Sequence, residues 1–568
     1  MVLYALLVSL SASQSCSQTL ALSPSGVATS NHYVHDDIHV QTLYNCLTGG
    51  NTTAVVAGKN WIAKLFNDSD CDICVYVGNP TNPSYVSPAV PDSYILGGLG
   101  STIPRYYISN GSDVAPPGYD STLSWGFDTT VFPSDKWIID QAINVVNNSD
   151  PDFMYILLAN MDEAGHLYGS FQDGVNPNFN NFINYQAMKD QLSITDSEVG
   201  RFIQFLSSNN KLSDSLIVVT ADHGMSTMMN ASKTVDLREI LKNKGINMRA
   251  YDRTLLGHYN SSGDYDWLMS EGPVAYIYNV TPTKIADIKS DLMNYELSEN
   301  EKPIWQVLNK TDQLSYNLYC PDYGSVIWPD LIVLMQQNYM CPVYYDEFTM
   351  GVNAFMAEIN VPPIGIGDVP TIPGAHGTYS EQRVPLIVNG SGVTVGTNNT
   401  RVSTLDIVPT ICHMNSWDKP TGAAGNVLLD VGTPPSTRAR RTYIIALDGM
   451  RSDYYNYGSP SLTPNLAKLA SHGRVYTNCT DVLVALTGTN HVAIITAAPA
   501  GTSGILGVGA YYTGLDMSES EVGVGGIVLP VDKITLLAPY IGLASTIIVG
   551  TAVTAVCVKR VRRRKEKQ

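Results

Sequence analysis

Short apolar runs alternate with amphipathic stretches along much of this chain of 568 residues. Uninterrupted apolar runs are typical of strands that are buried on both faces of a parallel sheet. Such strands are predicted at residues 153–159, 216–220, 331–334, 385–388 and 443–447. Helical patterns occur at residues 136–147, 193–207 and 465–472. The alternation predicts an α/β fold, with a doubly wound, mostly parallel sheet and helices on both faces.

Acidic motifs follow three of these predicted strands: NMDEAGH, TADHGMS and LDGMRSD. The carboxyl ends of parallel strands meet at one edge of a sheet, where ligands bind. A fourth motif, GAHG, places a histidine in a tight loop between glycines. Together the motifs supply three aspartates and three histidines, namely Asp162, His166, Asp222, His223, His376 and Asp448.

Carboxylate and imidazole side chains are suitable ligands for Zn²⁺ or a similar divalent ion. Six of them suffice for two ions about 4 Å apart, the arrangement that serves in-line displacement at phosphorus. Each residue alone is a weak signal, because an Asp after a strand is often a helix cap and a single His is often an ordinary surface or core residue. Only the combination indicates a metal centre.

The same motifs resemble those of the nucleotide pyrophosphatase/phosphodiesterase branch of the alkaline phosphatase superfamily. The stretch LDGMRSDY and the following TPNLAKLASHG belong to the resemblance, as does LTGTNHVAIIT, which is similar to the nucleophile turn T-x-x-N-H of that family. This turn places Thr487 four residues before His491. The stretch TLDIVPTI, at residues 404–411, resembles the end of the family's domain. The resemblance covers most of the chain and implies an alkaline-phosphatase-like fold with an inserted cap.

The resemblance also implies roles for these residues. One metal ion would be held by Asp222, His223 and Asp448, with Thr487 Oγ beside it. The other would be held by Asp162, His166 and His376. Both ions would most suitably be Zn²⁺, and Thr487 would attack phosphorus to give a phospho-threonine intermediate that water then hydrolyses.

The implied function is hydrolysis of phosphodiester or pyrophosphate bonds in nucleotides or related small phosphate esters. A phosphomonoesterase or phosphonate hydrolase on the same site is an alternative, and so is a surface binding protein with weak turnover. A sulfatase is disfavoured because the chain has no C/S-x-P-x-R segment.

The order of the motifs departs from the family. The strand ending at Asp448 and the nucleophile turn come last here, whereas they come first in the family. We interpret this as a circular permutation of one domain, with residues 18–430 as its main part, a cap at about 226–330, a linker at 431–441 and the remaining part at 442–518. A truncated tandem array that is completed in trans, or an erroneous joining of two fragments, would give the same order.

A second departure concerns an amide. The family has an Asn about twenty residues after the nucleophile that holds a phosphoryl oxygen, and Val508 stands at that position here. Asn31, in a stretch with similar spacing, is the proposed substitute, because loss of such a donor costs a few kcal/mol of transition-state stabilisation. Lys59, Asn60 and Trp61 in AGKNW either line the site or form an ordinary strand-to-helix turn.

The two ends of the chain predict export and a membrane anchor. Residues 1–17 resemble a signal peptide, although they contain no Lys or Arg. Residues 534–558 contain no charged residue and are long enough to span a bilayer after a stalk at 519–533. The basic tail at 559–568 should stay cytoplasmic, which predicts a single-pass protein with its catalytic domain at the cell surface. A buried core helix with a solvated tail is the alternative.

Charge and cysteine usage fit that location. The formal net charge is −17, and because seven Lys or Arg and one Glu follow residue 558, the rest carries 27 basic and 50 acidic residues, a balance of −23. This argues against a face that binds nucleic acid. Eleven N-x-[ST] sequons predict a glycoprotein. Cys71 with Cys74, or Cys320 with Cys341, are candidate disulfides.

Overall fold

The fold is that of a computed structural model, which describes part of the chain. The described residues are 21–22, 27–30, 38–48, 50–66, 71–76, 85–86, 95–96, 132–170, 182–227, 235–242, 246, 248–250, 266–278, 280–321, 326–341, 374–435, 441–458, 461–507 and 510–513. They all belong to one compact unit, Met1–Val524. The second unit, Gly525–Gln568, lies outside the described residues.

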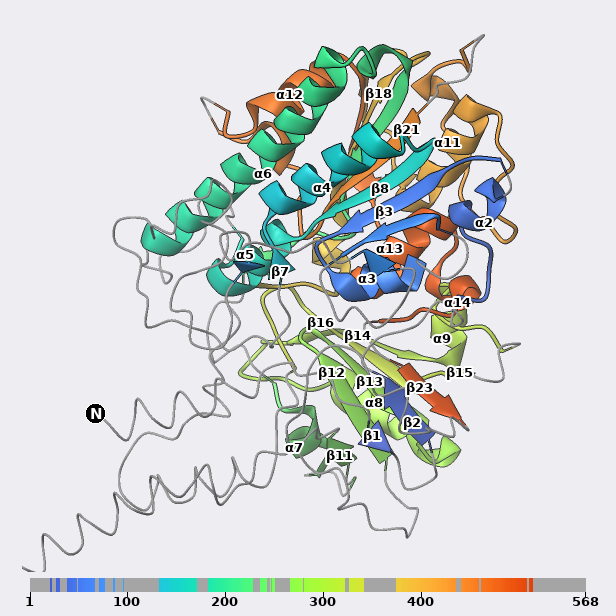
Figure 1. The fold of residues 1–568 in the computed structure, drawn as a ribbon. Coiled ribbons are helices and arrows are strands. Elements are labelled where there is room, and N and C mark those ends of the chain that lie inside the picture. Colours follow the sequence, from blue (N-terminus) through green and yellow to red (C-terminus); the bar gives the residue numbers. More distant parts are fainter. Residues whose placement is uncertain are drawn as a thin grey trace, which may run out of the picture. The chain divides into compact units, whose positions relative to one another are not determined.

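A ten-stranded sheet forms the centre of this unit (Figure 1). Its strands lie in the order β19 (Gly396–Asn398), β22 (Arg474–Thr480), β18 (Arg383–Gly390), β9 (Ser215–Thr220), β21 (Arg441–Leu447), β8 (Phe153–Leu158), β3 (Thr53–Ala57), β4 (Ile73–Val75) and β5 (Tyr85–Val86), and β20 (Val402–Ser403) also pairs with β22. Every pairing from β9 to β5 is parallel. The predicted mixed α/β fold with a largely parallel sheet is confirmed.

Two of the predicted parallel strands are placed differently. The run at 385–388 lies in the main sheet, but its strand β18 is antiparallel to both β9 and β22. The run at 331–334 belongs to another sheet as β16 (Leu331–Met335) and is antiparallel to both of its neighbours. Both runs are fully apolar because both faces are covered, and burial of this kind does not distinguish parallel from antiparallel pairing.

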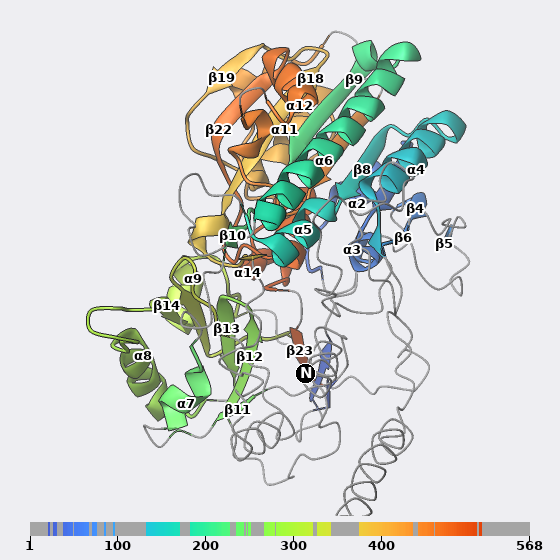
Figure 2. The same ribbon diagram turned by 90° about the vertical axis from the view of Figure 1, so that its left-hand side faces the viewer.

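Helices cover both faces of the main sheet (Figures 1 and 2). On β21, the ring of Tyr443 packs edge-on against Phe202 with centroids 5.3 Å apart, whereas the hydroxyl of Thr442 accepts a hydrogen bond from Asn415 Nδ2 at 3.0 Å. Successive residues of a strand point to opposite faces, so the helices that carry Phe202 and Asn415 lie on opposite faces. These helices are α6 (Phe182–Ser208) and α11 (Ile407–Asn415).

The remaining helices of this part have well-defined bounds. They are α2 (Leu43–Leu47), α3 (Asn60–Phe66), α4 (Asp135–Asn148), α5 (Asn160–Tyr168), α12 (Pro464–Ser471), α13 (Thr487–Thr496) and α14 (Ala500–Ser503). Helix α4 begins where the hydroxyl of Ser134 accepts a hydrogen bond from the backbone N–H of Trp137. Helix α12 begins on the carboxylate of Asp196, which accepts backbone N–H bonds from Asn465 and Leu466 and so ties α12 to α6.

A five-stranded sheet occupies the region predicted as a cap. Its strand order is β11 (Met248–Ala250), β12 (Asp266–Glu271), β13 (Val274–Tyr278), β16 and β14 (Ile304–Asn309), and its helices are α7 (Leu237–Lys242), α8 (Ile285–Met293) and α9 (Lys310–Ser315). The sheet includes β16, so it extends beyond the predicted boundary at residue 330. Tyr276 of β13 donates a hydrogen bond to the carbonyl of Leu506, which joins the sheet to the segment that follows α14.

Three small sheets complete the described elements. They pair β1 (Ala21–Leu22), β2 (Val27–Ser30), β23 (Ala510–Thr513) and β15 (Val326–Ile327) in one sheet, β10 (Ser226–Thr227) with β17 (Gly374–Ala375), and β6 (Ile95–Leu96) with β7 (Phe132–Pro133). The predicted signal peptide, stalk, membrane span and basic tail lie outside the described residues. Among the described residues, no helix combines the length and the apolar character that crossing a bilayer requires.

The cysteine pairings suggested by the sequence are not formed. In the structure, no disulfide joins Cys71 to Cys74 or Cys320 to Cys341. Burial raises the pKa of the Cys71 thiol to about 12, so this side chain is a neutral, buried group. The CDIC stretch, residues 71–74, contributes Ile73 and Cys74 to β4.

Arg441, predicted to end the linker, instead begins β21 and anchors it. Its guanidinium forms a two-bond fork with Asp150 at 2.6 and 2.7 Å and contacts both carboxylate oxygens of Asp214 at 2.8 and 2.9 Å. The side chain is only 4% exposed. Hydrogen bonds from Arg441 and Lys211 hold the pKa of Asp150 down, at about 2. This ion-pair network connects the start of β21 to the segments that precede β8 and β9.

The Arg441→Met variant should lower the free energy of unfolding at pH 7 by about 1.5–3 kcal/mol, the usual cost of losing charged hydrogen bonds at a buried position. Asp150 has a depressed pKa in the folded state, so its contribution is present above its unfolded pKa of about 4 and is lost as the pH falls through about 2. The difference in free energy of unfolding between wild type and variant, measured in urea, should therefore become smaller toward pH 2. Lys136→Met, which removes a surface pair with Asp140, is the control and should cost under about 1 kcal/mol.

Candidate metal centre and nucleophile

Neighbouring strands of the main sheet deliver the predicted acidic ligands to one edge. Asp448 directly follows β21, Asp222 comes two residues after β9, and Asp162 lies in the first turn of α5 after β8. Because β9, β21 and β8 are adjacent and parallel, their carboxyl ends coincide. All three aspartates are buried, with at most 1% exposure.

Close backbone packing holds these strand ends together. Gly449 has a φ of +73°, and a Cβ at this position would lie 2.7 Å from the Cα of Asp162. Only glycine fits both the left-handed backbone and this approach. The N–H of Asp448 donates to the carbonyl of Leu158 at 2.9 Å, and the N–H of Gly449 donates to Asp222 Oδ1 at 3.3 Å. Backbone packing and these two hydrogen bonds, one of them to the Asp222 carboxylate, thus hold the three acidic strand ends together.

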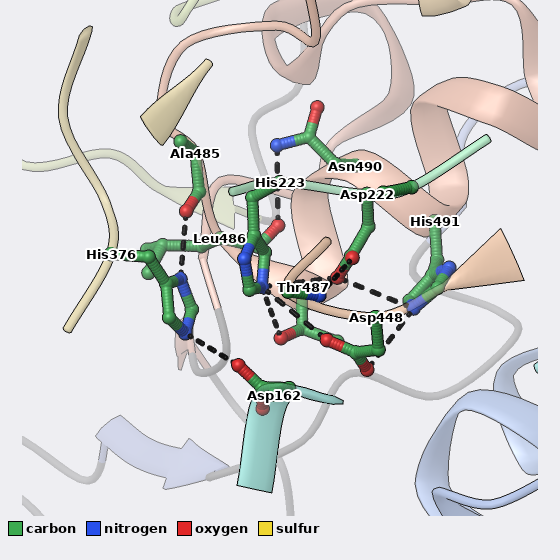
Figure 3. A network of polar contacts seen from close by, with 12 residues as sticks. Asp162, Asp222, His223, His376, Asp448, Ala485, Leu486, Thr487, Asn490 and His491 are labelled. Atoms are coloured by element: carbon green, nitrogen blue, oxygen red, sulfur yellow. Dashed lines mark hydrogen bonds and ion pairs between the residues drawn. The ribbon is translucent and has the colours of Figure 1, made fainter. Parts of the chain in front are cut away.

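Thr487 is the first residue of α13, and its side chain is presented by a rigid turn. Asn490 fixes that turn: its side-chain oxygen accepts from the N–H of Val482, and its side-chain NH₂ donates to the carbonyl of Val484 at 3.0 Å. A helix N-terminus favours negative charge, which suits an alkoxide forming at Thr487. The hydroxyl lies 3.1 Å from His223 Nε2 (Figure 3).

The three predicted histidine ligands share one tautomer. Each places Nδ1 at hydrogen-bond distance from a backbone carbonyl, which can only accept: His166 from Gly374 at 3.0 Å, His223 from Gly224 at 2.8 Å and His376 from Ala485 at 2.9 Å. Nδ1 must therefore carry the hydrogen in each ring, and Nε2 faces the carboxylates. This is the orientation that second-shell partners impose on metal-binding histidines.

Within the described part of the chain, the ligand atoms gather into three overlapping groups, each small enough to hold one ion. These groups are Asp162 with His166 and His376, Asp162 with His223 and Asp448, and Asp222 with Asp448 and His491. The first is the predicted ligand set of one metal. The residues predicted for the other metal are also adjacent, since His223 Nε2 lies 3.1 Å from Asp222 Oδ2 and 3.6 Å from Asp448 Oδ1.

The electrostatics of this cluster are those of crowded buried charges. Burial alone lowers the pKa of His223, but Asp222, Asp162 and Asp448 outweigh it and raise this pKa to about 10. Burial and the neighbouring Asp222 raise the pKa of Asp448. Nitrogen and oxygen lone pairs converge here, so a cation between them is stabilised, whether a proton or a metal ion.

Unsatisfied oxygens show that the residues fit metal ions. Among the described residues, Asp162 Oδ1, Asp222 Oδ2 and both carboxylate oxygens of Asp448 are buried and accept no hydrogen bond. His223 Nε2 and Lys59 Nζ approach some of them at ion-pair distances, but without hydrogen-bond geometry. Buried carboxylate oxygens of this kind are costly unless they bind a cation. The donor set of imidazole nitrogens and carboxylate oxygens suits Zn²⁺ and related divalent ions.

Two residues of the cluster had no assigned role in the sequence-based ligand set. His491, known only as part of T-x-x-N-H, is fully buried, with Nε2 at 3.4 Å from Asp222 Oδ2 and Nδ1 at 2.7 Å from the hydroxyl of Tyr155. Lys59 contacts two of the aspartates directly. The sequence signal for His491 was its place in T-x-x-N-H, four residues after Thr487. Asn31 and Val508 lie outside the described residues, and so do the side chains of Asn60 and Trp61.

The sequence of this chain is similar to that of a known protein family. The sequence profile described as type I phosphodiesterase / nucleotide pyrophosphatase matches residues 52–348 and 442–521, more than half of the chain. His376 lies between the two matched stretches, yet its Nε2 is 3.5 Å from Asp162 Oδ1. Among curated proteins, none matches the chain in sequence. The profile match shows that the chain belongs to the type I phosphodiesterase/nucleotide pyrophosphatase family, whose members are metal-dependent hydrolases that act on small phosphate esters.

Proposed function

We propose that this protein is a two-metal hydrolase of phosphodiester or pyrophosphate bonds, in nucleotides or related esters, with Thr487 as the nucleophile. The observation that carries the proposal is the shared orientation of His166, His223 and His376. Three backbone carbonyls fix Nδ1–H in these rings and turn Nε2 toward buried carboxylates that accept no hydrogen bond there. A structural cluster without a ligand would not need this arrangement.

In this proposal the ligands divide as the family resemblance implies. Asp222, His223 and Asp448 hold one ion beside Thr487. Asp162, His166 and His376 hold the other, and Zn²⁺ is the ion that best suits three imidazoles and three carboxylates. The two ions, when bound, supply Lewis acidity and positive charge at the reacting phosphoryl group.

The chain's own residues then account for the displacement. Thr487 Oγ forms a bond to phosphorus while the bond to the leaving oxygen breaks, and the threonine retains the phosphoryl group. When the substrate is a diester, the phosphoryl group on the threonine keeps its second ester substituent. Water then cleaves the threonine ester and regenerates the hydroxyl. The start of α13 stabilises negative charge on Oγ, and Asn490 keeps the preceding turn rigid.

A direct test compares two substrates on the purified, metal-loaded chain. A chromogenic nucleotide diester should be hydrolysed faster than the corresponding monoester. Faster hydrolysis of the monoester, or of a phosphonate, would replace the proposed substrate class and keep the site. Stoichiometric metal without turnover of any ester would favour a binding protein.

Asn31 is proposed as the substitute donor to a phosphoryl oxygen. Loss of such a donor costs about 2.7–4 kcal/mol in comparable sites, so Asn31→Ala should reduce diester turnover by about 10²–10³-fold with unchanged metal content. Asn209→Ala is the control, because Asn209 is exposed at the end of α6 and hydrogen-bonds only locally, to the carbonyl of Phe205. Unchanged turnover in Asn31→Ala would remove this residue from the site.

We also propose the cell-surface location that the ends of the chain predict. The circular permutation remains a prediction as well. In support of a single domain, β21 pairs with β8 and β9 of the same chain, and α13 places Thr487 beside His223.

A further inference from the structure

Lys59 reaches the metal centre from a fourth neighbouring strand. It comes two residues after β3, which is parallel to β8 and adjacent to it. The intervening Gly58 donates its N–H to the carbonyl of Leu157 at 3.0 Å, and a Cβ there would lie 2.9 Å from the Cβ of Ala159. This close approach presses the chain against the end of β8 and directs Lys59 into the acidic cluster.

The ammonium of Lys59 contacts one aspartate from each proposed metal site. Its Nζ lies 2.6 Å from Asp162 Oδ2 and 2.9 Å from Asp448 Oδ2, and its side chain is 6% exposed. Asp162 and Asp448 are also the two aspartates that each take part in two of the three ligand groups. Each of the three ligand groups found among the described residues therefore contains at least one carboxylate that Lys59 contacts.

Charge makes the ammonium a competitor of metal ions at these carboxylates. Three buried aspartates in close proximity repel one another, and a lysine between two of them offsets part of that repulsion. A divalent ion bound by the same carboxylates would lie within a few ångströms of the ammonium, in a place where water screens little, and would repel it. Tight binding of metal therefore requires Nζ to move away from Asp162 or Asp448.

We propose that Lys59 is an internal cation that competes with divalent metal ions for Asp162 and Asp448. It keeps the acidic cluster assembled when no metal is bound and lowers the affinity of the loaded site. This inference rests on the proposed two-metal function, because it presupposes that the site binds divalent ions.

The test measures metal affinity and stability in the full chain after treatment with a chelator. Lys59→Met and Lys59→Gln remove the charge, and Lys59→Arg keeps it. Titration with Zn²⁺ against a chromophoric competitor should show at least about tenfold tighter binding in Met and Gln variants than in wild type and the Arg variant. Lys289→Met, which removes a partly exposed ion pair with Asp312 in the cap, is the control and should bind Zn²⁺ with the affinity of wild type.

Thermal stability without metal is a second readout, and it should change in the direction opposite to Zn²⁺ affinity. In chelator, the thermal midpoints of Lys59→Met and Lys59→Gln should fall below that of wild type, and saturating Zn²⁺ should close or reverse the gap. A variant that folds only with metal counts as the extreme of the same effect. Equal or weaker Zn²⁺ affinity in both neutral variants would overturn the role of Lys59 alone. Wild type that binds no Zn²⁺ would overturn both this inference and the proposed function.

Discussion

Replacing Thr487 by alanine is expected to reduce the turnover of a phosphodiester by at least about 10³-fold, because it removes the atom that attacks phosphorus. The change deletes a hydroxyl and a methyl group at the first position of α13, and the backbone of the turn is held by Asn490 and not by the threonine. Fold and metal content should therefore stay as in wild type. Initial rates, metal content and thermal unfolding of the same preparation would check the three parts.

The neighbouring Thr489 offers a matched control. It lies on the same helix, is fully buried, and its hydroxyl has no hydrogen-bond partner among the described residues. Thr489→Val keeps the shape and removes the hydroxyl, so it should leave turnover within about twofold of wild type. Equal losses of turnover in the two variants would mean that α13 tolerates no change. The loss in Thr487→Ala would then be no evidence that Thr487 is the nucleophile. Undiminished turnover in Thr487→Ala would exclude it as the nucleophile.

Asp448→Asn is expected to have the second large effect, through loss of metal. Asp448 takes part in two of the three ligand groups, and neither of its carboxylate oxygens accepts a hydrogen bond. An amide of the same shape removes one negative charge and a strong anionic ligand. The variant should retain clearly less metal than wild type and lose at least about 10³-fold in turnover, a loss comparable to removal of a catalytic group.

Stability separates this expectation from simple misfolding. Burial and the neighbouring Asp222 raise the pKa of Asp448 even with the Lys59 ammonium 2.9 Å from its carboxylate, so the charge of Asp448 is unfavourable in the cluster without a metal ion. In chelator, Asp448→Asn should therefore unfold at the same temperature as wild type or a higher one. Asp453→Asn, at an exposed pair with Arg451, is the control for metal content. A strongly destabilised Asp448→Asn would point to a structural role instead.

Much of the fold was readable from local patterns because buried parallel strands leave a strong signal. The runs that became β8, β9 and β21 are inner strands of the sheet. The acidic motifs that follow them lie at the carboxyl ends of these strands, as expected. The runs that became β16 and β18 were predicted as parallel strands, but both are antiparallel to their neighbours. An apolar run reports that both faces are covered, but not which strand lies alongside or in which direction.

The site shows the same division. Asp162, His166 and His376 could be grouped from their motifs, and their side chains do converge. His491 had no ligand role from the sequence, and Lys59 was left between lining the site and an ordinary strand-to-helix turn, because both contributions depend on which elements are neighbours. The structure places Lys59 in the site. Lys59 lies 103 residues from Asp162 in sequence and reaches it only because β3 pairs with β8. Arg441 likewise read as a linker residue until its partners Asp150 and Asp214 were known.

If Thr487 is the nucleophile, the phosphoryl group passes through a covalent ester with this threonine, and the stereochemistry at phosphorus reveals that step. Each in-line displacement inverts the configuration. A chiral phosphorothioate diester hydrolysed in isotopically labelled water should therefore give a product of retained configuration, the result of two inversions. Net inversion would mean that water attacks the substrate directly, and it would contradict the nucleophilic role of Thr487.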